Sequence, residues 1–284
     1  MANLAPSEKK ELAEKATMVR RLVVEMICRG KGGHLGGALS CADILATLFF
    51  KIMRIKPEDP FWEDRDRFIL SAGHKCLALY ACMALRGFFK EEALSSYGTI
   101  DSPFPGHPDR HKLPGVEANT GSLGHGLAIG VGMAIAGKMD AKNYRVYVLM
   151  GDGEIQEGTV WESAAAAAHY RLDNLVGIVD KNGLQIQGDT REVMNMEPLA
   201  EKWRAFGWQV REIDGHSFDE IYSALSQIPL KEKFPTVIIA NTVKGKGLSF
   251  AENIASFHQW APTEDECRRA FEEIKRLEEK ICQI

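Results

Sequence analysis

The chain has 284 residues, of which 45% are hydrophobic and 26% are charged, and its formal net charge is −4. This length and composition predict a globular protein with a full hydrophobic core, and we expect a single domain over residues 1–284. The nearly balanced charge excludes the basic surface of a nucleic-acid-binding protein, and no apolar run approaches the roughly twenty residues of a membrane span.

The N-terminus and the cysteines together predict a cytoplasmic protein. The first ten residues are too polar to form a secretory signal peptide. No two cysteines form a Cys-x-x-Cys pair, so we expect reduced thiols rather than disulfides or zinc ligands. The six cysteines are Cys28, Cys41, Cys76, Cys82, Cys267 and Cys282.

The first half of the chain is predicted to be mostly helical. Apolar residues at helical spacing predict a helix over 7–29, which ends at the glycine-rich segment 30–37. The further elements expected before residue 100 are a helix over 40–51, a strand over 68–71 and a helix over 74–85. Residues 100–120 are rich in proline and glycine and are expected to be irregular.

From residue 121 onwards, predicted helices and strands alternate. The helices span 121–141, 160–170, 198–206, 218–225 and 264–280, and the strands span 144–150, 175–179, 208–213 and 235–240. Such alternation predicts an α/β fold, a parallel sheet flanked by helices. Capping boxes at Ser217/Glu220 and Thr263/Glu266 support two of the helix starts.

Polar residues follow two neighbouring predicted strands. The strand 144–150 leads into GDGE at 151–154, and the strand 175–179 leads into DKNGL at 180–184. Ligands of open α/β sheets bind beyond the carboxyl ends of the strands, and glycines there let backbone N–H groups approach a phosphate. We therefore expect Asp152 and Asn182 side by side, where carboxylate, amide and carbonyl oxygens suit Mg²⁺ or Ca²⁺ on a diphosphate. Taken alone, GDG is also typical of an ordinary strand-to-helix turn.

These segments resemble the cofactor-binding motif of thiamine diphosphate enzymes, and their neighbours narrow the resemblance to transketolases. The transketolase-like segments are GDGEIQEG at 151–158, Trp161-Glu162 and IVDKNGLQ at 178–185. The resemblance extends from GHLG at 33–36 to His258. It implies the thiamine-diphosphate-binding PP-domain fold and the transfer of a two-carbon ketol unit between small sugars, from a ketose (phosphate) to an aldose (phosphate).

The resemblance also implies roles for individual residues in binding the cofactor. The implied metal ligands are Asp152, Asn182 and the carbonyl oxygen of Leu184. The implied contacts of thiamine diphosphate are His74, Gly121, Ser122, Leu123, Gly153, Glu154, Asn182, Lys244 and His258. Gly37 stands where some relatives carry a serine that contacts the cofactor.

Four of the eight histidines lie in glycine-rich or irregular segments. They are His34, His74, His107 and His258. Imidazole titrates near neutrality, and a ketol transfer moves protons on and off sugar hydroxyls. The resemblance implies that His34, His107 and His258 are catalytic residues facing the sugar. We expect structural roles for His111, His169 and His216.

The resemblance further implies a second chain. In transketolases the cofactor sits between two domains, and the glutamate that activates it lies in the pyrimidine-binding domain, which this chain is expected to lack. We therefore expect a separate C-terminal transketolase subunit carrying that domain, in an α₂β₂ assembly. Glu157 and Glu162 resemble residues at the interface between subunits, although a solvated helix face would also explain them.

Three alternative functions remain at this point. A deoxyxylulose-phosphate synthase fits less well, because the loop FPGHP at 104–108 resembles transketolases more closely. A transketolase specialised for a sulfosugar or another donor stays open, because the partner domain usually supplies much of the recognition of the substrate anion. A non-catalytic paralogue is disfavoured, because Asp152, Asn182 and the four histidines are all present.

Overall fold

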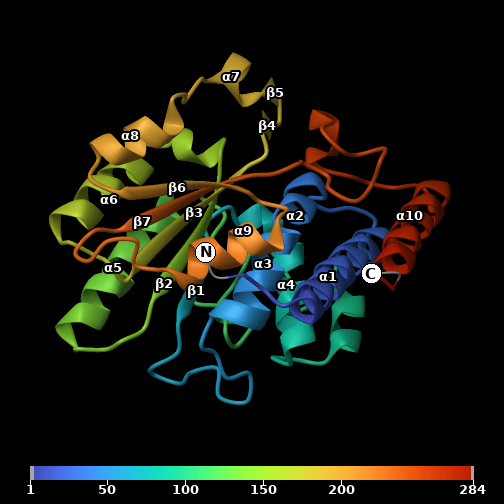
Figure 1. Ribbon diagram of the computed structural model, residues 1–284. Helices are drawn as coiled ribbons and strands as arrows, with labels where there is room; N and C mark the ends of the chain where they lie inside the picture. Colours follow the sequence, from blue (N-terminus) through green and yellow to red (C-terminus); the bar gives the residue numbers. More distant parts are fainter. Residues whose placement is uncertain (1–2, 283–284) are drawn as a thin grey trace.

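A five-stranded sheet forms the centre of the computed structural model, which describes residues 3–282 (Figure 1). Its strands are β1 (Arg67–Leu70), β2 (Val146–Gly151), β3 (Leu175–Lys181), β6 (Gln209–Asp214) and β7 (Thr236–Asn241). They lie in the order β1-β2-β3-β7-β6, and every pairing is parallel. The predicted α/β fold with a parallel sheet is confirmed.

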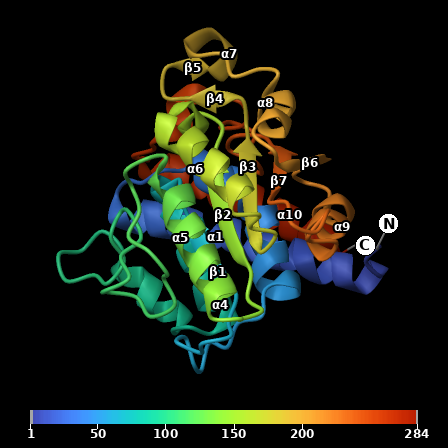
Figure 2. The ribbon, with the colours of Figure 1, turned by 90° about the vertical axis from the view of Figure 1, so that its left-hand side faces the viewer.

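Helices cover both faces of this sheet. One layer contains α5 (His125–Met139), α6 (Gly158–His169) and α8 (Leu199–Ala205). Figure 2 looks onto this layer, with α5 and α6 in front of the strands. The opposite layer contains α1 (Pro6–Gly30), α2 (Gly36–Ser40), α3 (Ala42–Thr47), α4 (Cys76–Arg86) and α9 (Phe218–Ser226), with α10 (Glu264–Cys282) outside α1.

The strands bury side chains on both faces, as a sheet between two helical layers requires. Successive side chains of a strand point to opposite faces. In β2, Val146, Val148 and Met150 pack with the α5/α6/α8 layer, whereas Tyr147 and Leu149 pack with the α1/α4 layer. All five are fully buried.

Short elements complete the chain. The two-residue strands β4 (Leu184–Gln185) and β5 (Gly188–Asp189) form a hairpin, which α7 (Thr190–Val193) follows. A π-helix spans Leu48–Ile52, and 3-10 helices span Gly73–Lys75, Glu91–Ser96, Glu154–Gln156 and Ala255–His258. The expected irregular region 100–120 contains neither helix nor strand.

Two predicted helices differ from the observed ones at their boundaries. The helix expected from residue 121 begins at His125, because Gly121 and Gly124 adopt φ values of 142° and 83°, which a right-handed helix does not contain. The helix expected over 40–51 begins earlier, at Gly36, and its backbone leaves the helical region at Cys41 before α3. The other predicted elements agree with the structure to within a few residues.

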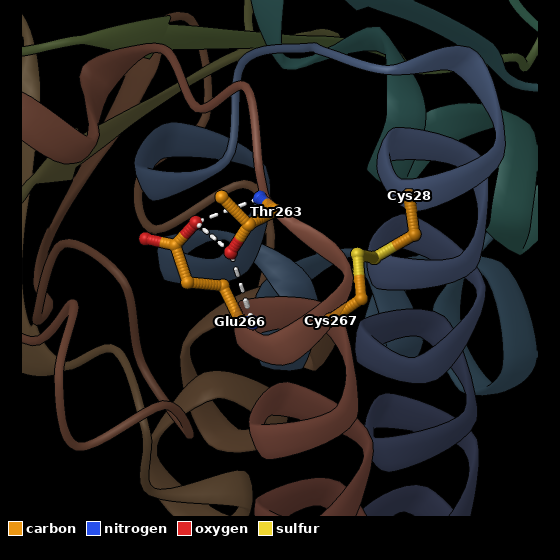
Figure 3. Close-up of a disulfide and its surroundings, with 4 residues drawn as sticks. All are labelled: Cys28, Thr263, Glu266 and Cys267. Carbon is orange, nitrogen blue, oxygen red and sulfur yellow. Dashed lines mark hydrogen bonds between the residues drawn. A yellow bond between two sulfur atoms is a disulfide. The ribbon is translucent and has the colours of Figure 1, made fainter.

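The expectation that all six cysteines are reduced is wrong. Cys28 in α1 and Cys267 in α10 form a disulfide, with their Cα atoms 6.0 Å apart (Figure 3). The Thr263/Glu266 capping box beside it, also drawn in Figure 3, fixes the start of α10: Glu266 N donates to the Thr263 hydroxyl and Thr263 N to the Glu266 carboxylate. The sequence separation of 239 residues left no local pattern to reveal the pair.

None of the helices within residues 3–282 combines the length and the apolar character needed to cross a membrane.

We predict that the unreduced, denatured protein contains four titratable thiols, because Cys41, Cys76, Cys82 and Cys282 are free and the other two are paired. Reduction should lower the thermal midpoint, since a cross-link over a long loop typically contributes about 2–4 kcal/mol. Thiol titration and calorimetry of the native protein test this. Six thiols before reduction would contradict the pairing, and Cys282→Ser is the control that should leave the midpoint unchanged.

Candidate functional site

A cleft of about 370 Å³ lies beyond the carboxyl ends of β2, β3 and β7, where open α/β sheets bind ligands. Segments from opposite ends of the sequence meet there, because the 3-10 helix before α10 lies against α2 (Figure 1). The predicted residues that line the cleft are His34, His74, His107, Gly121, Leu123, Asp152, Gly153, Glu154, Glu157, Asn182, Leu184, Lys244 and His258. Ser122 and Glu162 are exposed and lie outside this lining.

Asp152 is held at the end of β2 by backbone donors. Its Oδ1 accepts a hydrogen bond from Gly153 N at 3.0 Å, and its Oδ2 accepts one from Gly183 N at 2.6 Å. Only 7% of the residue is exposed. Burial, together with the charge of the neighbouring Asp180, raises the pKa of Asp152 to about 6. A site that raises the pKa of a carboxyl in this way favours a cation beside it.

Asn182 follows the strand next to Asp152, as expected from the two neighbouring strands, and the Leu184 carbonyl, implied by the resemblance, lines the same cleft. Gly151 pairs with Asp180 in the sheet, so the two loops that follow leave the same edge. Asn182 Oδ1 accepts from Leu184 N at 3.1 Å, and the Leu184 oxygen accepts from Lys244 Nζ at 3.4 Å. Within residues 3–282 no group of three or more His, Cys, Asp or Glu side chains is arranged to hold a metal ion. A cation here would therefore need oxygens from its ligand as well.

A buried ion pair that the sequence did not reveal lies next to these residues. Lys75 Nζ is 2.6 Å from Asp180 Oδ2, and the two side chains are 2% and 0% exposed. The hydroxyl of Ser40 also donates to Asp180, at 2.5 Å, and that of Thr242 donates to its second oxygen. Burial disfavours the charge of Lys75, but Asp180 more than offsets this, and the pKa of Lys75 is raised.

Glu154 organises the glycine-rich loop before α5. Its carboxylate accepts from Gly124 N at 2.9 Å, from Gly151 N at 3.0 Å and from the hydroxyl of Ser71. Burial raises the pKa of this carboxyl. The sequence implied a backbone contact for Glu154, whereas the structure gives its side chain the separate task of holding this loop in the cleft wall.

The four predicted histidines converge from four separate segments. The ring centroid of His34 lies 5.3 Å from those of both His74 and His258, and 6.2 Å from that of His107. His74 and His258 are 5.1 Å apart. Gly121 allows His107 to approach, since a Cβ there would lie 2.9 Å from its ring.

Burial keeps three of these imidazoles neutral near pH 7. It lowers the pKa of His74 to about 2, with Lys75 adding to the effect, and that of His258 to about 4, with Lys244 adding to it. The pKa of His34 is lowered as well, first by burial and then by the neighbouring His107. His258 Nδ1 lies 3.3 Å from Lys244 Nζ, so the histidine cluster adjoins the buried lysine of the same cleft.

His216, expected to be structural, supports the loop that carries Lys244. Its Nδ1 lies 2.7 Å from Asp43 Oδ2, and its Nε2 accepts from Val243 N at 2.9 Å. Arg20 pairs with the same carboxylate and donates to the Lys246 carbonyl at 3.0 Å. Burial opposes ionisation of Asp43, but these two partners outweigh it and lower its pKa to about 2.

The cleft therefore combines two kinds of chemistry. One end offers buried lysines, backbone N–H groups and oxygen ligands, which suit an anion with a hard cation. The other end offers neutral imidazoles, which can donate to and accept from hydroxyl groups. Glu157 is exposed at the rim between them.

Comparison with known proteins shows which family the chain resembles. The family model described as "Transketolase, thiamine diphosphate binding domain" matches residues 12–276. The chain is 45% identical over 262 residues to an apulose-4-phosphate transketolase subunit from Phocaeicola vulgatus, covering 92% of this chain and 93% of that protein. It is 43% identical over 266 residues to a 6-deoxy-6-sulfo-D-fructose transketolase subunit of a Clostridium species, covering 94% and 97%.

The fold is also shared with solved transketolases. The crystal structure of transketolase from Campylobacter jejuni superposes with a TM-score of 0.86 at 35% identity and covers 93% of this chain. This chain spans 42% of that longer enzyme. The chain therefore belongs to the transketolase family and corresponds to its thiamine diphosphate-binding domain.

Proposed function

We propose that this chain is the cofactor-binding subunit of a two-subunit transketolase, which transfers a two-carbon ketol unit from a ketose phosphate to an aldose phosphate. The observation that carries the proposal is the single cleft in which the Asp152/Asn182/Leu184 oxygens adjoin four histidines. The naming of two relatives as subunits, and their near-complete coverage by this chain, support the two-chain arrangement. Ketol transfer by the chain with its partner, and none by the chain alone, is the test.

Thiamine diphosphate with Mg²⁺ (or Ca²⁺) fits the phosphate end of the cleft. Asp152, Asn182 and the Leu184 carbonyl would supply three oxygens, and the diphosphate would supply others, which suits a hard cation that lacks an all-protein cage. Gly121, Leu123 and Gly153 would let the cofactor approach the backbone, with Glu154 and Lys244 as further contacts from the lining. Ser122, which lies outside the lining, is proposed to contribute through its backbone. When bound, the cofactor supplies the electron sink for breaking the carbon–carbon bond next to a carbonyl.

The histidines would act on the sugar. His34, His107 and His258 are proposed as catalytic residues, and His74 and His258 as contacts of the cofactor. Because burial favours the neutral ring of His34 and His258, these imidazoles can accept a proton from one hydroxyl and return it to another. Gln259 Nε2, 3.1 Å from His34 Nε2, helps to orient that ring.

The outer face of α5 supports a partner chain. This helix carries almost only apolar or small residues around its whole circumference, and such a helix is normally buried on all sides. Yet Ala128, Gly132, Ala136 and Met139 are exposed, and Ala165 is exposed on the adjacent α6. We infer that other chains of an α₂β₂ assembly, including the pyrimidine-binding subunit, cover this face.

Glu157 and Glu162 are proposed interface residues at the edge of the same face. Both are exposed, and neither has a side-chain hydrogen bond or ion pair among residues 3–282. Glu157 also lines the cleft. A partner that covers α6 would therefore meet two unpaired carboxylates, one of them beside the cofactor site.

A second candidate for the donor is a sulfonated ketose instead of a phosphorylated one. The two subunit relatives act, by their names, on apulose-4-phosphate and on 6-deoxy-6-sulfo-D-fructose, and their identities to this chain are nearly equal, at 45% and 43%. The sulfonated donor is therefore the second candidate. Rates of ketol transfer from phosphorylated and sulfonated ketoses, measured with the reconstituted enzyme, separate the two.

We also propose that residues 1–284 form one domain and that the protein acts in the cytoplasm. The single domain is supported by one central sheet whose two faces pack with the two helical layers. The cytoplasmic location rests on the polar first ten residues alone. The cysteines no longer support it, because Cys28 and Cys267 form a disulfide and disulfides are rare in cytosolic proteins.

Replacing the carboxylate of the proposed metal site should abolish the dependence of cofactor binding on the metal. Asp152→Asn keeps the shape but removes the charge, and we expect binding of thiamine diphosphate at saturating Mg²⁺ to weaken by at least ~10-fold. Isothermal titration calorimetry measures this, with exposed Asp101→Asn as the matched control. Unchanged, Mg²⁺-dependent binding by Asp152→Asn would contradict the metal site.

The imidazoles of His74 and His258 should stay neutral through the physiological range. Their pKa values are lowered to about 2 and about 4, so protonation requires more acid than the usual midpoint near 6.5. Side-chain NMR of the unliganded protein should therefore show no titration of either ring between about pH 6 and 8. A midpoint near 6.5 for His258 would show that its ring is not buried as described.

A charge on the exposed face of α6 should prevent assembly. Ala165→Glu would place a carboxylate without a partner in the interface, while a helix tolerates glutamate well in the free chain. We expect loss of the complex in sedimentation analysis with the partner subunit, whereas folding of the chain alone should be unchanged. Ser226→Glu, exposed on α9 in the opposite layer, is the control. Normal assembly of Ala165→Glu would place the interface elsewhere.

A further inference from the structure

A second lysine besides Lys244 reaches the phosphate end of the cleft. Lys75 lines the cleft, although its side chain is only 2% exposed. A Cβ added to Gly151 would lie 3.5 Å from Lys75 Nζ, so the ammonium lies beside the glycine that precedes Asp152. Neither the motif nor its spacing indicated this residue.

Two adjacent glycines of α2 make room for the two lysines. A Cβ on Gly36 would lie 2.7 Å from Lys244 Cγ, and a Cβ on Gly37 would lie 3.1 Å from Lys75 Cε. Both distances are shorter than the usual contact of about 3.5–4.0 Å between carbon atoms. The two lysine stems therefore cross consecutive residues of the same helix, and both ammonium groups point to one cleft.

Two N–H groups of the Lys75 ammonium have no acceptor among the described residues. An ammonium carries three N–H donors, and among residues 3–282 the only hydrogen bond of Lys75 Nζ is the one to Asp180. The same carboxylate also accepts hydrogen bonds from the hydroxyls of Ser40 and Thr242, and it takes only one of the three N–H donors of Lys75. A buried cation with unused donors beside an open cleft is suited to an anionic oxygen.

We propose that Lys75 binds the diphosphate directly, together with Lys244, and that Asp180 is the positioning residue that fixes its ammonium. This inference rests on the proposed function, since it concerns the same cofactor site. Asp180 would hold the charge of Lys75 in place before the cofactor arrives. The diphosphate would then take the two N–H donors that the protein leaves unused.

The test must distinguish two roles of Lys75: direct binding of the diphosphate, and neutralisation of the charge of Asp180. Lys75→Met keeps most of the stem and removes the charge, but it leaves Asp180 buried without a cation. The double variant Lys75→Met with Asp180→Asn removes both charges and keeps the size of the side chain and one acceptor oxygen at position 180. Lys246→Met is the matched control, because Lys246 is half-exposed and pairs with Glu252 at the surface.

The measurement is calorimetric titration of the full-length chain with pyrophosphate and with thiamine diphosphate, each with Mg²⁺, together with circular dichroism of every variant. We expect about 10- to 100-fold weaker binding of both probes by Lys75→Met and by the double variant, the range for one lost hydrogen bond to a charged group. The control should bind as the wild type does.

The opposite results overturn the proposal in distinguishable ways. Recovery of wild-type affinity in the double variant would mean that Lys75 only neutralises Asp180. Wild-type affinity of folded Lys75→Met would mean that the lysine does not contribute to binding. If the wild-type chain bound neither probe, the proposed function itself would fail, and this inference would fail with it.

Discussion

The candidate site depends on one buried carboxylate. Asp180 is the penultimate residue of β3 and has no exposed surface. It accepts hydrogen bonds from α2 through Ser40, from the segment before α4 through Lys75 and from the loop after β7 through Thr242. Three segments far apart in the sequence are thereby fixed at one edge of the sheet. Removing one partner of such a buried ion pair typically costs about 3–5 kcal/mol, because the other charge stays uncompensated.

This arrangement also explains the electrostatics of the cleft. Burial, and then the charge of Asp180 nearby, disfavour the charged form of Asp152, and the pKa of Asp152 is raised to about 6 as a result. The same two causes act on the cation Lys244: burial, and then the positive charge of Lys75, lower its pKa to about 8. The site thus holds two neighbouring carboxylates and two neighbouring lysines. A bound cation would reduce the repulsion between the carboxylates, and a bound anion would reduce the repulsion between the lysines. Perturbed pKa values of this kind cluster at functional sites, and these are consistent with the proposed binding of a metal and a diphosphate together.

The sequence predicted those parts of the site that follow from local order along the chain. Asp152 and Asn182 directly follow two strands, so the parallel register alone was enough to bring them together. The Lys75–Asp180 and Cys28–Cys267 pairs join residues 105 and 239 positions apart, and no periodic pattern connects such residues. The start of α5 was missed for a different reason, since the positive φ of Gly124 is a conformational choice that glycine permits but does not require.

The cleft lies next to the helices that we propose a partner chain covers. Glu154 links the end of β2 to Gly124, the residue before α5, so the exposed apolar helix begins where the cleft wall ends. A chain that covers α5 and α6 would consequently approach the rim at Glu157 and the exposed Ile186 of the β4–β5 turn, which is 67% exposed and lines the cleft. The partner chain would then cover this apolar surface and close the cleft in a single step, and the half-buried imidazoles would become fully enclosed only in the complex. Exclusion of water strengthens every electrostatic interaction in such a site. This is a physical reason for a cofactor-binding chain to depend on its partner for activity even where its own residues already hold the cofactor.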